Sequence, residues 1–140
     1  MRRIAITLFI ILIFTAGVVS AREILQADAC IITEEETIQG NLFVLCRTME
    51  IAGKVEGSII GASTNVVIHP SGVIDGSLYL LAAQMDIAGE VGENIHFAGG
   101  VLNIHDSARL SADTGDLLSL SLSTQLQPQA RIPRNIVALG

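Results

Sequence analysis

Short runs of alternating apolar and polar residues follow one another along residues 30–140. Leu78-Tyr79-Leu80 and Met85-Asp86-Ile87 are typical, and such runs are bounded by Gly, Asn, Asp, Ser or Pro. A period of two is that of a β-strand, because the face of a helix recurs every 3.6 residues. The pattern therefore predicts an all-β chain in which strands of three to five residues are joined by turns.

These runs belong to an internal repeat that two separate markers define. The first marker begins at positions spaced 17, 19, 17, 19 and 22 residues apart, namely Ile38, Val55, Ile74, Val91, Leu110 and Ile132. The second marker ends at Ile51, Ile68, Ile87, Ile104 and Leu126, and its spacings of 17, 19, 17 and 22 advance together with the first. Two markers that stay in register over about six copies predict a solenoid, wound in one direction from similar coils.

Stacking of the coils would place equivalent residues about 4.8 Å apart, which is the distance between neighbouring strands. Four inward ladders are expected. They are Ile38, Val55, Ile74, Val91 and Leu110; Leu42, Ile59, Leu78 and Ile95; Val44, Gly61, Leu80 and Phe97; and Ile51, Ile68, Ile87, Ile104 and Leu126.

The amino terminus has the order of a secretory signal. Arg2 and Arg3 precede an uncharged, mostly apolar run over residues 4–19, and the small residues of Val19-Ser20-Ala21 follow. We expect cleavage after Ala21, and the alternative is an uncleaved membrane anchor, although a spanning helix needs about 20 apolar residues. The chain thus divides into a signal helix or anchor at 1–21, a linker at 22–29 and one solenoid domain at 30–140.

Removal of residues 1–21 would leave six basic residues against fourteen acidic ones, a net charge of minus eight. An acidic surface argues against nucleic acid or anionic lipid as a partner. Half of the chain is apolar but only 4% is aromatic, which favours a core of thin layers of Ile, Val and Leu.

The three histidines, His69, His96 and His105, are the candidates for a metal site. In the repeat, His69 and His105 share one turn position two coils apart, and His96 lies in the other half of its coil. No metal site is therefore expected within one chain, and a site between subunits is the alternative. No P-loop, nucleophile elbow or dinucleotide fingerprint is present in the sequence, so we expect no catalytic residues and no cofactor.

Cys30 and Cys46 are the only cysteines, and an exported location permits a disulfide. Their separation of 16 residues is close to one coil, although the repeat places Cys30 beside Met49 rather than directly beside Cys46. We predict a bridge that clamps the first coil, and the alternative is two buried thiols.

The ends of the solenoid are candidate assembly edges, at Ile32, Ile38, Ile132 and Ile136. An open end is a row of unpaired backbone groups, which solenoids normally cover with a cap. The segment Ile136-Val-Ala-Leu-Gly140 matches the first half of a coil, as in Ile95-His-Phe-Ala-Gly99, and shows no cap. Either the natural chain continues beyond it, or this end pairs with another copy.

One column of outward residues is unusually apolar. If Leu42, Ile59, Leu78 and Ile95 point inward, the next residues, Phe43, Ile60, Tyr79 and His96, point outward. This stripe is a candidate lateral contact. The alternative is that ladders of similar side chains stabilise the stacking of coils by themselves.

The pattern Gly53-Lys-Val55-Glu-Gly57-Ser-Ile59, repeated in Gly72-Val-Ile74-Asp-Gly76-Ser-Leu78, resembles the repeat of bactofilins, the polymer-forming bacterial cytoskeletal proteins. The resemblance covers residues 30–140 and implies a single-stranded right-handed β-helix that stacks end to end into filaments without nucleotide. Combined with the export signal, it favours a self-associating scaffold in the bacterial envelope, membrane-associated or extracytoplasmic.

Two other classes of function stay open. One is an envelope binding module for glycan or protein that uses one solenoid face. The other is a left-handed hexapeptide-repeat enzyme, suggested by a six-residue series from Val73 through Tyr79, Met85 and Val91 to Phe97. Spacings of 17 and 19 are not multiples of six, and the series does not run through the second and fifth coils, which disfavours the enzyme.

Overall fold

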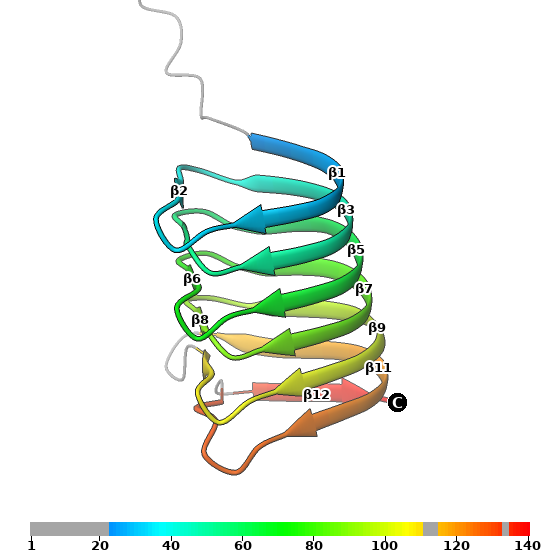
Figure 1. Cartoon of the computed structure of the whole chain (residues 1–140). Helices are drawn as coiled ribbons and strands as arrows, with labels where there is room; N and C mark the ends of the chain where they lie inside the picture. The colour runs from blue at the N-terminus through cyan, green and yellow to red at the C-terminus, as the bar shows by residue number, and fades with distance from the viewer. Residues whose placement is uncertain (1–22, 111–114, 133–134) are drawn as a thin grey trace, which may run out of the picture.

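A computed structural model describes residues 23–110, 115–132 and 135–140. Within these residues every regular element is a β-strand, and parallel strands stack coil upon coil from the amino-terminal end to the carboxyl-terminal end (Figure 1). The predicted all-β solenoid of about six turns is confirmed. The predicted signal helix or anchor at 1–21 lies outside the described residues.

Each of the first five coils contributes one long and one short strand, and the last two long strands have no short one among the described residues. The long strands form a seven-stranded parallel sheet in the order β1 (Glu23–Ile32), β3 (Leu42–Ile51), β5 (Ile59–Ile68), β7 (Leu78–Ile87), β9 (Ile95–Ile104), β11 (Asp116–Leu126) and β12 (Asn135–Leu139). The short strands form a five-stranded sheet from β2 (Thr37–Ile38), β4 (Lys54–Val55), β6 (Val73–Ile74), β8 (Glu90–Val91) and β10 (Arg109–Leu110).

The long strands are longer than the predicted runs of three to five residues, because pairing continues around a corner of the coil. In β7 and β9, Ala82 pairs with Gly99 and Gln84 pairs with Val101, while the residue between them is skipped. The inward positions change phase there, from Leu78, Leu80 and Ala82 to Met85 and Ile87. Two alternating runs in the sequence are thus the two halves of one bent strand.

The four predicted ladders have the expected register along the coils. Ile38 pairs with Val55, and the other members of this and the remaining ladders follow in order. Most of their side chains are fully buried in a single apolar core. Ile38 and Gly61 are partly buried. Leu126 is 42% exposed, because β12 covers only the first half of β11.

Residues 23–29, expected to be a linker, instead form most of β1. Their register with β3 places Glu23 at the position of Leu42 and Ala27 at the position of Cys46. The repeat is hard to recognise here because Glu23 stands where the next coil has the aliphatic Leu42. The backbone pairing with β3 nevertheless continues to the start of β1.

Candidate functional site

The amino-terminal end of the solenoid is formed by β1 and β2. Among the described residues, β1 pairs only with β3 and β2 only with β4, so each strand has one backbone edge without a neighbouring strand. Ile32 is 2% exposed, and its carbonyl accepts hydrogen bonds from the backbone N–H groups of Ala52 and Gly53 at 2.8 and 3.2 Å. Of the predicted edge residues, Ile32 therefore lies in the terminal strand with its side chain in the core. Ile38 is partly buried against the same core.

The carboxyl-terminal end is apolar and only partly covered. β12 pairs with Asp116–Leu120 of β11, and no described strand covers the remainder of β11 on the side away from β9. Large side chains at this end are solvent-exposed, including Leu122 at 87%, and also Leu126, Ile132, Ile136, Val137 and Leu139. Ile132 and Ile136, the two remaining predicted edge residues, are both in this group.

Under this end, the apolar core gives way to hydroxyl groups. Ser119 continues the buried ladder of Phe97 with a polar side chain. Its Oγ lies 2.9 Å from the Oγ of Ser121. Thr124 Oγ1 lies 2.7 Å from the same Ser121 oxygen. Because buried hydroxyls need hydrogen-bond partners, this mutual bonding lets the interior become polar in the last full coil.

One side of the solenoid is an exposed apolar face, made by the outward positions in the first halves of the long strands. The predicted stripe forms its first ladder, in which Phe43, Ile60, Tyr79 and His96 pair in order. The rings of Tyr79 and His96 are stacked, with centroids 4.8 Å apart and planes 5° from parallel. The ladder continues to Leu118 and Val137 at one end and to Ile24 at the other.

This apolar face contains a second ladder, which was not predicted from the sequence. It lies two residues further along each strand and contains Gln26, Leu45, Ala62, Leu81, Ala98, Leu120 and Leu139. Together the two ladders line a shallow groove of about 560 Å³. The signal in the sequence was a run such as Leu78-Tyr79-Leu80-Leu81, which is apolar at inward and outward positions alike.

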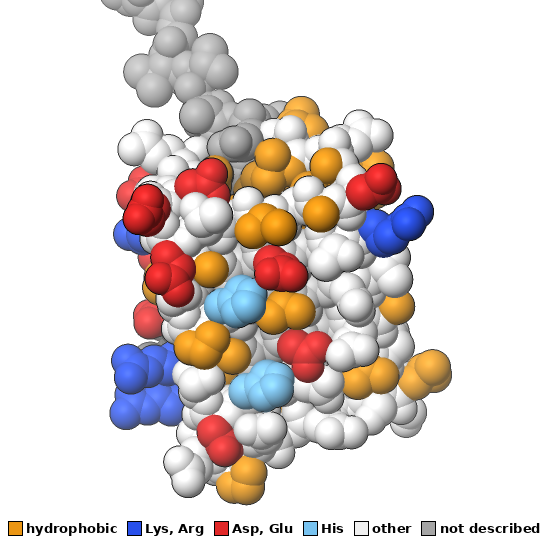
Figure 2. Space-filling view, viewed as in Figure 1, with side chains coloured by type: hydrophobic (Ala, Val, Ile, Leu, Met, Phe, Trp, Pro, Cys, Tyr) orange, Lys and Arg blue, Asp and Glu red, His pale blue; other side chains and the backbone are white. Residues whose placement is uncertain are grey.

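A different face is polar. In the view of Figure 2, histidine and acidic side chains alternate with apolar ones over the second halves of the long strands. His69 Nε2 lies 3.4 Å from Glu50 Oε2, and His105 Nε2 lies 3.4 Å from Asp86 Oδ1. In both pairs the acid precedes the histidine by 19 residues, so these are the same contact repeated two coils apart.

The histidines do not come together as a metal site. His69 and His105 each contact one carboxylate, while His96 stacks on Tyr79 on the apolar face. Within the described residues, no group of three or more His, Cys, Asp or Glu side chains is arranged to hold a metal ion.

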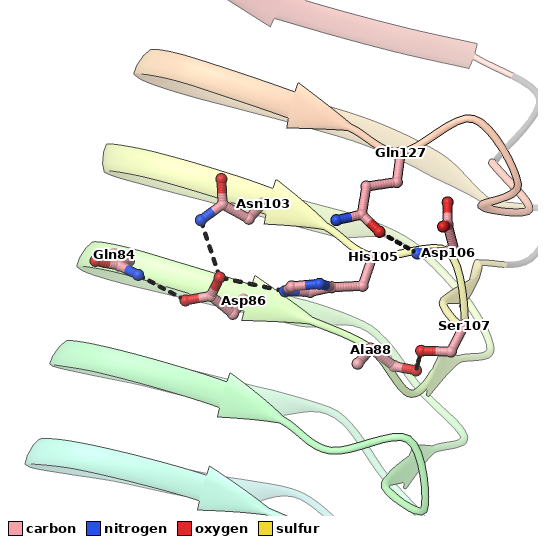
Figure 3. Close-up of polar contacts among 8 residues, drawn as sticks. All are labelled: Gln84, Asp86, Ala88, Asn103, His105, Asp106, Ser107 and Gln127. Carbon is pink, nitrogen blue, oxygen red and sulfur yellow. Dashed lines mark hydrogen bonds and ion pairs between the residues drawn. The ribbon is translucent and has the colours of Figure 1, made fainter.

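Asp86 is the centre of the polar contacts (Figure 3). Its Oδ1 accepts a hydrogen bond from Asn103 Nδ2 at 2.9 Å and its Oδ2 accepts one from Gln84 Nε2 at 2.8 Å. Partial burial opposes ionisation of this carboxyl, but the bonds from Asn103 and Gln84 and the neighbouring His105 outweigh it. The pKa of Asp86 is consequently below its ordinary value. These contacts join two coils and form no catalytic arrangement of acid, base and nucleophile.

A disulfide joins Cys30 in β1 to Cys46 in β3, with Cα atoms 6.1 Å apart. Cys30 is paired in register with Met49, and Cys46 with Ala27. The bridge therefore runs diagonally across the buried side of the first two coils, on either side of the corner in the long strands.

The coil repeat and the parallel stacking agree with the comparison to known families. A family model for bactofilins, described as polymer-forming cytoskeletal, matches residues 30–132. The chain belongs to the bactofilin family. Bactofilins are a structural, polymer-forming family rather than a family of enzymes.

No curated protein and no solved structure gives a significant match to this bactofilin. The family match covers all coils from Cys30 to Ile132, including the candidate edges at Ile32, Ile38 and Ile132. Among its described residues, no helix has the length and apolar character needed to cross a membrane.

Proposed function

We propose that this bactofilin is an exported scaffold protein of the bacterial envelope, which polymerises by end-to-end stacking of its solenoid coils without nucleotide. The observation that supports this most directly is the state of the two ends. Each end presents a strand edge that no described strand pairs, and the carboxyl-terminal end adds exposed aliphatic side chains.

Such ends favour addition of another copy for two physical reasons. Unpaired N–H and C=O groups along a strand edge are satisfied when a further strand pairs with them. Side chains such as Leu122 and Leu126, exposed at the end, lose contact with water under a further coil, at about 25 cal/mol for each Å² removed. Backbone pairing and apolar burial together need no bound nucleotide.

Export is supported by the amino-terminal sequence and by the disulfide. Residues 1–21 have the composition of a signal helix or membrane anchor, which would place the solenoid outside the cytoplasm or at the membrane surface. A disulfide between Cys30 and Cys46 is stable in an oxidising compartment and rare in the cytoplasm.

The winding that we propose is right-handed. Parallel strands of one sheet are joined here by connections that pass through the short strands of a second sheet. Crossovers between parallel strands are right-handed in about 98% of cases, and this preference acts at every coil of the solenoid.

The test is electron microscopy combined with light scattering, at several protein concentrations and without nucleotide. The protein is purified as the cell holds it, with residues 1–21 either cleaved or present. Filaments or open-ended oligomers that grow with concentration are expected. A folded species that stays monomeric at every concentration would overturn the proposal and favour an envelope binding module.

A further inference from the structure

The apolar face has a relief that repeats every second coil, and we propose that this relief is a contact surface for a second copy of the chain. Leucine and alanine alternate along its second ladder, in the order Leu45, Ala62, Leu81, Ala98 and Leu120. The three leucine side chains are 59%, 60% and 50% exposed. Since coils are about 4.8 Å apart, the leucines are separated by about 9.6 Å with one alanine hollow between neighbours.

The face is also free of formal charge. From Ile24 to Leu139, neither ladder contains Asp, Glu, Lys or Arg, although the chain as a whole has fourteen acidic residues. Soluble proteins rarely expose a contiguous apolar surface of this length unless something covers it. The groove of about 560 Å³ between the two ladders gives the covering surface a shape to fit.

A two-fold axis parallel to the strands would bring the second ladder against itself, with the two solenoids running in opposite directions. When the axis passes between the rungs of Leu81 and Ala98, Leu81 of each copy meets the other copy's Ala98. The same operation places Leu120 against Ala62. Every leucine in the middle of the face then fills an alanine hollow, so the alternation is complementary to itself.

The area of the apolar face determines whether two single chains can form a stable pair. Seven strands of about 4.8 Å spacing and five residues of about 3.3 Å rise give a patch of about 29 by 16 Å. About 470 Å² for each copy is below the roughly 800 Å² of a standard stable interface. Lateral pairing therefore rests on the proposed end-to-end polymer, in which many weak contacts act together.

A lipid surface is the other chemistry that an apolar face could meet, and the residues argue against it. A lipid surface has no fixed ridges and hollows that alternating leucines and alanines could fit. Alanine at every second position would then only reduce the apolar area in contact with lipid. Membrane-binding surfaces are typically rich in Lys and Arg, which both ladders lack. The observations favour a second copy, and the lipid surface becomes one outcome of the test.

The test uses Ala98→Leu alone and Ala98→Leu combined with Leu81→Ala, both in the full chain. The single substitution fills the hollow that the other copy's Leu81 needs, and the double one exchanges ridge and hollow so that the surfaces fit again. Electron micrographs are expected to show paired filaments for the wild type, at least tenfold fewer pairs for Ala98→Leu, and pairs again for the double variant. Thermal unfolding checks that all three chains are folded.

Two results would overturn the proposal. One is that Ala98→Leu filaments remain paired. The other is that Ala98→Leu binds phosphatidylcholine vesicles more strongly than the wild type while the double variant restores no pairing, which would assign the face to lipid.

A second measurement does not need stable pairs, because covalent crosslinking also captures a weak contact between single chains. Variants Ala62→Cys and Leu120→Cys are mixed and treated with a short bismaleimide. Crosslinked dimers are expected in the mixture but not in either variant alone, because like positions of the two copies are three coils, about 14 Å, apart. Equal crosslinking in the separate variants, or none in the mixture, contradicts the two-fold contact. If the wild type forms no filaments, the end-to-end function fails, and this crosslinking experiment still decides the lateral contact.

Discussion

The ring of Tyr79 lies flat against the ring of His96 in the next coil, with ring centroids 4.8 Å apart. Parallel, in-register strands place equivalent residues one above the other, so two aromatic rings at the same coil position must stack. The same geometry stacks leucine over alanine one column away. One ladder of the apolar face therefore stabilises the coil stack, while the other gives the face its relief.

Replacing Tyr79 by Ala should lower the free energy of unfolding by about 1 kcal/mol, since stacked aromatic pairs contribute roughly 0.5–1.5 kcal/mol beyond their burial. Urea unfolding followed by circular dichroism measures the change. The matched control is Tyr79→Phe, which keeps the ring and should remain close to the wild type. Equal loss in both variants would contradict a role for ring stacking.

Reduction of the Cys30–Cys46 bridge should destabilise the solenoid by about 3 kcal/mol, because it releases a closed loop of this length in the unfolded chain. The midpoint of urea unfolding should therefore fall when a reductant is added. The double variant Cys30→Ala/Cys46→Ala should start from the lower midpoint and show no response to reductant. A wild-type midpoint insensitive to reductant would show that the bridge does not stabilise the fold.

Asp86 should make the stability of the solenoid depend on acid pH. Its pKa is lower in the folded chain than its ordinary value of 3.8, so the ionised carboxylate stabilises the fold above that value. This stabilisation is lost as the pH falls through the lower folded pKa. Asp86→Asn should flatten this part of the pH profile of thermal unfolding.

Glu90→Gln, at an exposed position of β8, is the control for a general effect of removing one negative charge. It should leave the acid part of the profile close to that of the wild type. Identical profiles for the wild type and Asp86→Asn would contradict the stabilising role of the contacts from Asn103 and Gln84.

The sequence predicted the coil register because three of the four ladders repeat an aliphatic residue at a fixed position, as Ile51, Ile68 and Ile87 do. It could not predict that β1 begins at Glu23, since the pairing of that strand depends on backbone bonds to β3 rather than on an aliphatic marker. The leucine–alanine ladder escaped detection for a related reason. Ala62 and Ala98 are ordinary residues in the sequence, and they become hollows only when the coils place Leu81 between them.

Gly61 shows a further limit of reading ladders from sequence. It occupies an inward ladder position between Val44 and Leu80, where an added Cβ would overlap the carbonyl oxygen of Val44. Gly61→Ala should therefore destabilise the fold by about 1–3 kcal/mol, as overpacking does. Thr64→Ala, at the exposed corner of the same strand, should change little in the same unfolding experiment, and a stable Gly61→Ala would contradict the overlap.

The amino-terminal edge offers a way to stop polymerisation without disturbing the core. The carbonyl of Ile32 faces the next coil, where it accepts hydrogen bonds from Ala52 and Gly53. Backbone direction alternates along a strand, so the N–H of Ile31 faces the open edge, and its side chain is 57% exposed. Ile31→Pro removes this donor and adds a ring where another strand would approach, a change that edge strands tolerate.

The expected result for Ile31→Pro is a folded chain whose critical concentration for filament growth is at least tenfold higher, measured by light scattering and electron microscopy. Ile31→Thr is the matched control, because it removes the same aliphatic side chain but retains the backbone donor. If Ile31→Thr suppresses filaments as strongly as Ile31→Pro, the side chain rather than the strand edge drives assembly. If both variants polymerise like the wild type, end-to-end stacking does not use β1, since an approaching strand could not pair with an edge that proline blocks.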